Sequence, residues 1–392
     1  MKKIRLLTPG PTPVPERLSL RMAKPIVHHR SPEFEAVFAK VREGLQYVFE
    51  TKQDVLVFAA SGTGAMEASF VNFLRKGDSV VVVDGGKFGE RWGKFAKAYG
   101  INAVTLKCEW GSPVKPEQVQ KALESNPDIK AVYVQANESS TGVYHPIQEL
   151  AQVTAKSKAL LVVDAISALG AMPLPMDAWG IDVLVSAGHK ALGLPPGIAF
   201  LAASDKAWAQ NETADLPRFY FDVKRERDNQ KKNQTAWTPA ITLVEGLEES
   251  LAMYREEGLQ NVFARHERMA KSARAAMQAL GLTLYSKSPS NAMTTVLAPD
   301  GVDSEKLVKH LFKQYGIKLV GGQDAAKGRI FRIAHLGYFD DFDMLVVIGA
   351  IERGLHDLGA KIELGAGLAA AQRSFYQATG NEQRTAPRNV QA

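Results

Sequence analysis

Several features that mark common protein classes are scarce or missing in this chain of 392 residues. It has one cysteine, Cys108, so no intrachain disulfide can form, which fits a reducing compartment. No stretch approaches the roughly 20 apolar residues of a membrane-spanning helix. The basic start of the chain runs into a proline-rich stretch rather than the apolar core of a signal peptide. A cytoplasmic protein with no membrane partner is therefore expected.

Common catalytic and binding motifs are also missing. The eight histidines show no metal-ligand spacing, and no nucleophile elbow, Walker loop or dinucleotide fingerprint is present. The formal net charge is +6, but the basic residues are spread along the chain. Only 224–227 and 231–232 are locally dense, which favours a solvated face over a nucleic-acid site. We therefore expect no metal and no nucleic-acid partner.

Short apolar runs separated by helical segments dominate the first half of the chain. Because the runs are continuously apolar, they predict buried strands of a mainly parallel sheet with helices on both faces. A helical apolar period covers residues 31–49. The runs lie at residues 55–58, 80–83, 131–134, 160–163, 183–185 and 198–201, and 103–106 is a further apparent strand. The fold class is therefore α/β.

In the second half of the chain the pattern of apolar residues changes to long helical periods and short strands. This pattern predicts a smaller α+β domain. We expect helices over 262–280 and 342–358 and short strands near 294–296, 317–320 and 330–333. The predicted division is an extended N-terminal arm (1–20), a large domain (21–257), a small domain (258–377) and a flexible tail (378–392). The proline-rich arm would cross either onto a partner subunit or over its own subunit.

An aspartate and a lysine follow two of the predicted strands. Asp164 closes the run at 160–163, and Lys190 comes shortly after the run at 183–185. Ligands of such sheets bind at the carboxyl ends of the strands. A lysine amine forms a Schiff base with an aldehyde, and a carboxylate keeps the ring nitrogen of pyridoxal 5'-phosphate (PLP) protonated. Asp164 as a turn cap and Lys190 as a surface lysine are the alternatives, but apolar flanks favour a buried, functional lysine.

Two further segments fit the same cofactor. Ser61, Gly62 and Thr63 lie between a strand and a helix, where free backbone N–H groups would hold a phosphate. Simple helix capping is the alternative. Phe88 stands among glycines and would stack on a pyridine ring, although a core phenylalanine has the same appearance.

Ser139 and Arg332 complete the candidate site. Ser139 lies in a polar cluster behind the strand at 131–134 and would bond the ring hydroxyl of the cofactor, unless it belongs to an ordinary turn. Arg332 lies in a predicted strand of the small domain. Its planar guanidinium would pair with a substrate carboxylate, with a structural ion pair as the alternative.

In these motifs the chain resembles the class V PLP-dependent aminotransferases, closest to the alanine–glyoxylate and serine–glyoxylate aminotransferases. The resemblance spans about residues 5 to 360 in the family's order. The motifs that carry it are the opening at 8–12, His29–Arg30–Ser31, 61–67, 138–142, 163–165, 188–190 with 195–197, and 331–333 with 336–337.

The resemblance implies a fold-type I homodimer with sites at the subunit interface. Lys190 would carry PLP, Asp164 would pair with the ring nitrogen, and Arg332 would bind the substrate carboxylate. The family's other cofactor contacts would fall on Ser61, Gly62 and Thr63 (phosphate), Phe88 and Ile166 (the two ring faces), Ser139 (ring hydroxyl) and Thr238 (the neighbouring subunit's phosphate). Two positions depart from the family: His189 replaces its usual glutamine, and Thr235 stands where it often has tyrosine.

The expected function is transamination between a small L-amino acid, with alanine or serine favoured, and glyoxylate or another small 2-oxo acid. Two alternatives stay open. His189 suggests desulfurase or lyase chemistry, although Cys108 lies in the wrong segment for the mobile cysteine that a desulfurase needs. The other alternative is a non-catalytic PLP-binding subunit, which has little need of Arg332.

Overall fold

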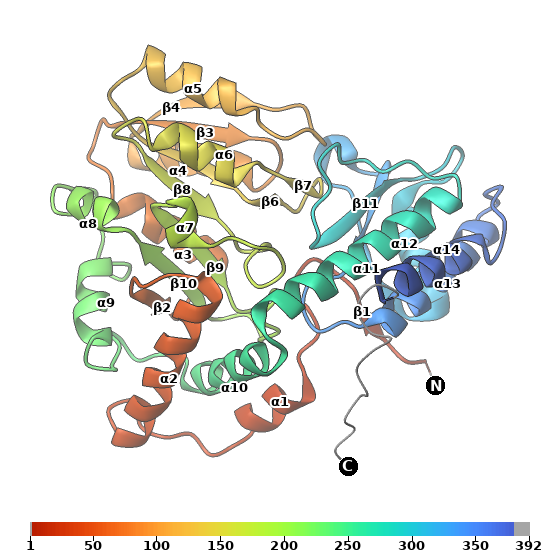
Figure 1. Ribbon diagram of the computed structural model, residues 1–392, viewed down its shortest axis with the longest axis horizontal. Coiled ribbons are helices and arrows are strands. Elements are labelled where there is room, and N and C mark those ends of the chain that lie inside the picture. Colours follow the sequence, from red (N-terminus) through yellow and green to blue (C-terminus); the bar gives the residue numbers. More distant parts are fainter. Residues whose placement is uncertain (1, 380–392) are drawn as a thin grey trace.

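The computed structural model describes residues 2–379, and its centre is a seven-stranded sheet (Figure 1). The strands lie in the order β2, β10, β9, β8, β5, β3 and β4. β10 is antiparallel to both neighbours, whereas the other adjacent pairs are parallel. Their bounds are β2 Val55–Phe58, β3 Ser79–Asp84, β4 Asn102–Lys107, β5 Ile129–Gln135, β8 Leu160–Asp164, β9 Val183–Ala187 and β10 Ala199–Ala203. The predicted α/β class with a mainly parallel sheet is confirmed.

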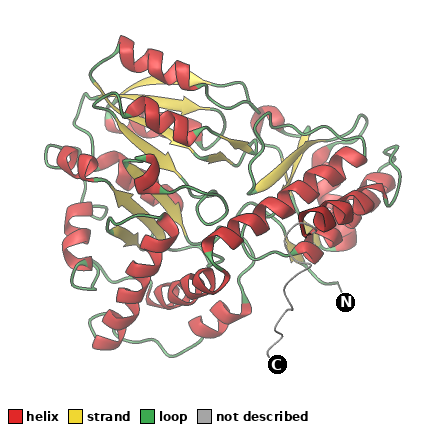
Figure 2. Cartoon of the chain, in the orientation of Figure 1, coloured by secondary structure: helices red, strands yellow, loops and turns green. Residues whose placement is uncertain are grey.

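Helices cover both faces of this sheet (Figure 2). Two separate apolar clusters fill the space between the sheet and these helices. Along β5, Val132 and Val134 enter one cluster while Ala131 and Tyr133 enter the other, because successive side chains of a strand point to opposite faces. The first face packs against α2 Pro32–Phe49, α5 Pro116–Ser125, α6 Ile147–Thr154 and α10 Ile241–Glu257. The second packs against α3 Gly62–Val71, α4 Gly89–Tyr99, α8 Asp205–Asn211 and α9 Val223–Gln230.

The second half of the chain builds its own antiparallel sheet of three strands in the order β11, β14 and β13. A third apolar cluster joins this sheet to helices, the longest of which is α11. The bounds are β11 Met293–Leu297, β13 Val320–Gly321, β14 Ile330–Ala334, α11 Leu259–Ala279, α12 Ser304–His310, α13 Asp341–Asp357 and α14 Ala366–Thr379. The domain limits at 257 and 377 remain predictions.

One sequence expectation in this half is wrong, and one helix has no counterpart among the expectations. The single strand expected over 317–320 is two short strands, β12 Ile317–Lys318 and β13, because the chain passes from one sheet to another at Leu319. Helix α14 was not predicted; its Ala371 and Phe375 are buried in the third apolar cluster. The expected flexible tail falls mostly outside the described residues.

The remaining elements are short. They are β6 Asn137–Glu138, β7 Val143–Tyr144, α7 Met176–Trp179, a π-helical turn Leu311–Tyr315 and a 3-10 turn Asp324–Ala326. Within residues 2–379, no helix has both the length and the apolar character that a membrane crossing requires.

The N-terminal segment packs on its own chain. β1 Arg5–Leu6 pairs in parallel with β12, and the Leu7 N–H donates to the Lys318 carbonyl at 3.0 Å. The extended stretch ends at Pro15, earlier than expected, because Glu16–Met22 forms helix α1. Of the two alternatives for this arm, residues 5–7 follow the one in which it stays on its own subunit.

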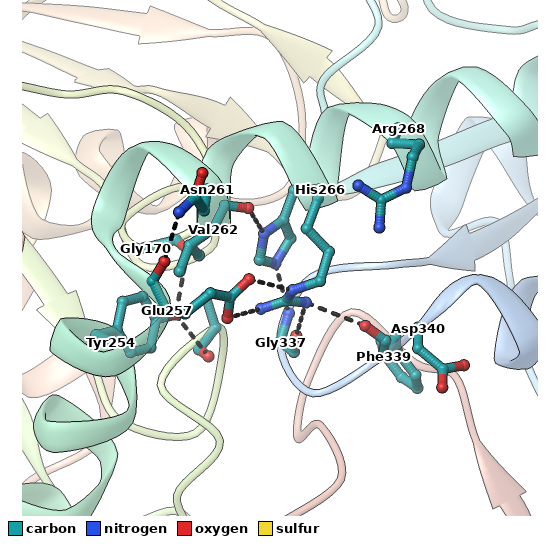
Figure 3. A network of polar contacts seen from close by, with 12 residues as sticks. Gly170, Tyr254, Glu257, Asn261, Val262, His266, Arg268, Gly337, Phe339 and Asp340 are labelled. Carbon is teal, nitrogen blue, oxygen red and sulfur yellow. Dashed lines mark hydrogen bonds and ion pairs between the residues drawn. The ribbon is translucent and has the colours of Figure 1, made fainter. Parts of the chain in front are cut away.

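A polar network ties the loop after β14 to α11 and, through Glu257, to the end of α10 beside the large sheet (Figure 3). The Arg265 guanidinium on α11 donates to both Glu257 carboxylate oxygens, at 2.7 and 3.0 Å, and to the Gly337 and Phe339 carbonyls, both at 3.0 Å. The neighbouring His266 holds the same loop, since its Nε2 accepts from the Gly337 N–H at 3.0 Å. β14 carries Arg332, so this network helps to fix where Arg332 stands relative to the large sheet.

We expect acid to lower the free energy of unfolding through His266. Burial lowers its pKa to about 3, so the folded protein keeps the ring neutral while the unfolded chain takes up a proton. This contribution is fully present above about pH 6.5 and is lost as the pH falls toward 3. The free energy of unfolding lost in this way between pH 7 and pH 5 is about 2 kcal/mol. Urea unfolding at both pH values measures it. His266→Gln should flatten the dependence, and an unchanged slope would contradict this assignment.

Candidate active site

The polar residues predicted to bind a cofactor gather at the carboxyl ends of the parallel strands. Asp164 is the last residue of β8 and is 5% exposed. One of its carboxylate oxygens, Oδ1, accepts the Ile166 N–H at 2.8 Å. Burial raises the pKa of Asp164 to about 7, and the Glu138 charge adds to this, whereas Arg91 and Lys190 oppose it. The carboxylate is therefore poised to ionise fully when a cation reaches it.

Lys190 lies in the loop after β9, and its Nζ donates to the Pro9 carbonyl at 2.7 Å. Burial lowers the pKa of this amine to about 8. The Asp164 charge opposes the shift, while Arg332 and Arg91 enlarge it. An amine with this pKa has a substantial neutral fraction near neutral pH, as a nucleophile or proton carrier requires.

This pKa gives a prediction for cofactor attachment. The neutral amine is the nucleophile, so the rate at which the apoprotein takes up PLP should rise with pH, with a midpoint near pH 8. Stopped-flow absorbance of the apoprotein mixed with PLP over pH 6–10 measures this rate. A midpoint near 10.4, the value for an exposed lysine, would show that Lys190 is not perturbed in solution.

The N-terminal arm lies directly against Lys190. The Thr12 hydroxyl donates to the Lys190 carbonyl at 2.7 Å, so the arm is bonded to the backbone and to the amine of the same residue. Gly10 has a φ of +147° and packs closely against the lysine side chain. A Cβ atom there would lie 2.6 Å from Lys190 Cε and 2.8 Å from Cδ, so an added side chain would force the lysine side chain or the arm to shift.

Gly10→Ala should therefore displace either the arm or Lys190. We expect the rate of turnover to fall by about a hundredfold, because small displacements of a reacting group have effects of this size. Steady-state kinetics and PLP titration measure the loss. Gly93→Ala is the control, because a Cβ atom at Gly93 meets nothing within 4 Å. Equal effects of the two substitutions would contradict the role of the Gly10 contact.

The predicted phosphate-binding turn lies at the start of α3. Ser61 is the N-cap residue, but its side chain forms no capping bond, and Gly62 opens the helix. A Cβ atom at Gly62 would lie 2.6 Å from Ile166 Cδ1, so the turn and the predicted ring-stacking residue are in contact. The Thr63 hydroxyl accepts from Arg91 Nη1 at 2.8 Å. A helix N-terminus with an adjacent guanidinium suits an anion.

Phe88 stands just before α4, and its ring is half-buried. The Arg91 guanidinium lies over this ring, with Cζ 4.9 Å from the centroid. The Phe88 N–H donates to the Glu138 carboxylate at 3.1 Å. Sequence reasoning gave no role to Arg91 or Glu138. The signals in the sequence are that Glu138 opens the polar cluster a few residues after the apolar run at 131–134 and that Arg91 is three residues past Phe88.

Arg332 extends from β14 toward the large sheet and is 7% exposed. Its Nη1 donates to the Ser139 carbonyl at 2.6 Å, and Nε and Nη2 donate to the Gly321 carbonyl at 3.1 and 2.9 Å. Burial lowers its pKa to about 10. Among residues 2–379, no carboxylate forms an ion pair with it. A buried guanidinium with only carbonyl partners is suited to an incoming carboxylate.

The other predicted site residues are His189, Thr235 and Thr238. His189 adjoins Lys190, and burial lowers its pKa to about 4, so the ring is neutral. Thr235 is buried, and its hydroxyl donates to the Trp237 carbonyl at 2.6 Å. Thr238 is exposed and lines a small cleft with Tyr220 and Trp237, not with Lys190. Across the described part of the chain, no cluster of three or more His, Cys, Asp or Glu residues could hold a metal ion.

Comparison with known proteins assigns the family. The family model for class V aminotransferases matches residues 16–337, so the chain belongs to that family, and it is a PLP-dependent aminotransferase. The chain is 37% identical to the serine–glyoxylate aminotransferase of Methylorubrum extorquens, covering 93% of this chain and 94% of that protein. It is 36% identical to the L-aspartate–glyoxylate aminotransferase of Paracoccus denitrificans, over 97% and 98%.

A further relative and a solved structure are also similar to this chain. The chain is 43% identical to a protein of Synechococcus sp. named soluble hydrogenase, small subunit, over 95% of this chain and 98% of that protein. Its fold matches the crystal structure of ureidoglycine–glyoxylate aminotransferase from Bacillus subtilis with a TM-score of 0.91 and 28% identity, covering 96% and 99% of the two chains.

The geometry of the site fits PLP. Three features of the described residues match the three polar parts of the cofactor: the uncapped start of α3 for the phosphate, the buried Asp164 for the ring nitrogen and the Lys190 amine for the aldehyde. Gly62 leaves the turn without a side chain where Ile166 approaches. The Phe88 ring lies beside this turn, since Arg91 contacts both Phe88 and Thr63.

Proposed function

We propose that the enzyme transfers the amino group of a small L-amino acid, alanine or serine in preference, to glyoxylate or another small 2-oxo acid. The observation that carries this proposal is the buried Arg332 guanidinium, whose hydrogen-bond partners among residues 2–379 are all carbonyls and whose charge lowers the pKa of Lys190. A carboxylate clamp beside a nucleophilic lysine suits substrates that carry an α-carboxylate.

Each residue has a separate task in this reaction. Arg332 would hold the substrate α-carboxylate and so direct the Cα proton toward Lys190. The Lys190 amine would bind the cofactor covalently and then move a proton from Cα, acting as base and acid in turn. Asp164 would keep a proton on the ring nitrogen. When bound, PLP supplies the electron sink that makes the Cα proton acidic.

The visible spectrum tests the proposal directly. Purified protein loaded with PLP is mixed with alanine, serine or aspartate in turn, and glyoxylate is then added. We expect the cofactor band to convert with at least one donor and to return with glyoxylate. Aspartate belongs in the set because one relative is named for it. A band that no amino acid changes would contradict transamination.

A homodimer in the cytoplasm is part of the same proposal. Exposed aromatic side chains at Phe219 and Tyr220 lie near Trp237, next to Thr238, and together they suit burial against a second copy. Thr238 would then reach the partner's cofactor phosphate. Light scattering of the purified protein gives its mass. A monomer with full activity would contradict this arrangement.

The relative named as a hydrogenase subunit supports a second candidate, a PLP-binding subunit without turnover. With one cysteine, this chain falls short of the four thiolates that an iron–sulfur cluster ordinarily takes, so any such role would be as a companion subunit. The spectral experiment separates the two, because a companion subunit would bind PLP without converting it.

Desulfurase chemistry has less support. It would need a reactive thiol, but burial raises the pKa of Cys108 to about 11. Cys108 follows β4 at the edge of the sheet. Sulfide release from cysteine that requires Lys190 and survives Cys108→Ala would reopen this alternative.

A further inference from the structure

We propose that Glu138 is a positioning residue that fixes Phe88 by hydrogen bonds, and fixes Ser139 and Arg332 through the adjoining backbone, at the edge of the active site. The inference rests on the proposed transaminase function, and it gives a role to a buried carboxylate that the mechanism above does not use. It predicts that one side chain controls both cofactor affinity and substrate binding.

The Glu138 carboxylate clamps the turn that carries Phe88. Glu138 ends β6 and has an exposed fraction of 0%. Its Oε2 accepts the N–H groups of Phe88 and Gly89, at 3.1 and 2.9 Å. These two N–H groups lie at the start of α4, so the carboxylate also faces the positive end of that helix.

The second carboxylate oxygen fixes the other side of the same turn. Oε1 accepts from the N–H and from the hydroxyl of Ser140, at 3.1 and 2.5 Å. The Ser140 hydroxyl oxygen in turn accepts the Lys87 N–H at 3.1 Å. Gly86 packs directly on the clamp, because a Cβ atom there would lie 2.6 Å from Glu138 Cδ. The turn therefore has little freedom while this carboxylate is in place.

The same residue connects to the substrate clamp. Ser139 lies between Glu138 and Ser140, and its carbonyl accepts from Arg332 Nη1 at 2.6 Å. The Glu138 charge also raises the pKa of Arg332 against the effect of burial. Removal of the carboxylate would therefore alter the backbone to which Arg332 is bonded as well as the charge that favours its protonated form.

A carboxylate is needed because every partner is a donor. Three backbone N–H groups and one hydroxyl point at the two oxygens. An amide has only one acceptor oxygen, so a glutamine would set its own NH2 against backbone N–H groups. Buried donors would then lose their partners, and the turn would have to move.

The experiment compares Glu138→Gln with Glu138→Asp in the full-length protein. We expect Glu138→Gln to weaken PLP binding by about tenfold to a hundredfold and to change the visible circular dichroism of bound PLP. KM for the amino donor should rise by about tenfold or more. Glu138→Asp keeps both acceptor oxygens and should recover part of each effect. Glu352→Gln is the matched control, since Glu352 is a buried carboxylate that accepts the Gly365 and Leu368 N–H groups, each at 2.9 Å.

A double-mutant cycle with Phe88→Leu separates positioning from general instability. If Glu138 acts on the cofactor through Phe88, adding Glu138→Gln to Phe88→Leu should weaken PLP binding by no more than about twofold further, while KM still rises. Full additivity in PLP affinity, or equal losses in Glu352→Gln, would overturn the inference. PLP affinity is measured without turnover, so this test does not depend on the proposed function. A wild-type protein that binds PLP but transfers no amino group would contradict the proposed function and leave this test valid.

Discussion

Lys190→Ala is expected to lower the rate of amino transfer by at least about a thousandfold, with every donor tested. The substitution removes both the nucleophile that would attach the cofactor and the base that would take the Cα proton. Burial lowers the pKa of this amine to about 8 and its Nζ is bonded to the Pro9 carbonyl, so a water molecule would be a poor replacement for it. Formation of pyruvate from alanine, or of the matching keto acid from another donor, measures the rate.

Two controls separate chemistry from charge and from folding. Lys190→Arg keeps a positive charge, but a guanidinium stays protonated, so this variant should be as inactive as Lys190→Ala. Lys206→Ala removes a different amine that bonds the Ala159 carbonyl and Asp182, away from the strand ends that carry the site. It should keep its turnover. Full activity of Lys190→Ala would rule out the mechanism.

The sequence predicts the large sheet well, because six of its strands are buried along most of their length and read as unbroken apolar runs, whereas the edge strand β4 is largely exposed. For the same reason it predicts where Asp164 and Lys190 lie, since Asp164 directly follows one such run and Lys190 follows another by five residues, which places both near the carboxyl ends of strands. The fold then brings these ends together with no further information. Only local patterns were needed at this level.

What the sequence does not predict are contacts between segments far apart in the chain. Nothing in residues 8–12 indicates that the Pro9 carbonyl accepts from Lys190, or that Gly10 is required by the lysine side chain. Glu138 resembles any polar residue after a strand until its four donors converge on it from two segments. The single strand predicted over 317–320 is two strands in the structure, because its two halves pair with different sheets.

Asp164→Asn is the second substitution with a large expected effect, and we expect kcat to fall by about a hundredfold or more. The carboxylate would stabilise a protonated ring nitrogen only through its negative charge, and the neutral amide has almost the same shape without that charge. Burial already raises the pKa of Asp164 to about 7, so a cation at the ring nitrogen would be its strongest reason to ionise. PLP should still bind, more weakly, because the start of α3 and Lys190 are untouched.

Asp182→Asn is the matched control for this charge. Asp182 is also a buried carboxylate, but it accepts from the Leu161 N–H and the Ser204 hydroxyl just ahead of β9, at the end opposite to Asp164. It should lose stability and keep kcat, whereas Asp164→Asn should lose kcat with a smaller change in stability. If Asp164→Asn retained kcat, proton transfer from Cα would not depend on a charged partner at the ring nitrogen. The Lys190 amine and the Arg332 clamp would then have to account for the rate alone.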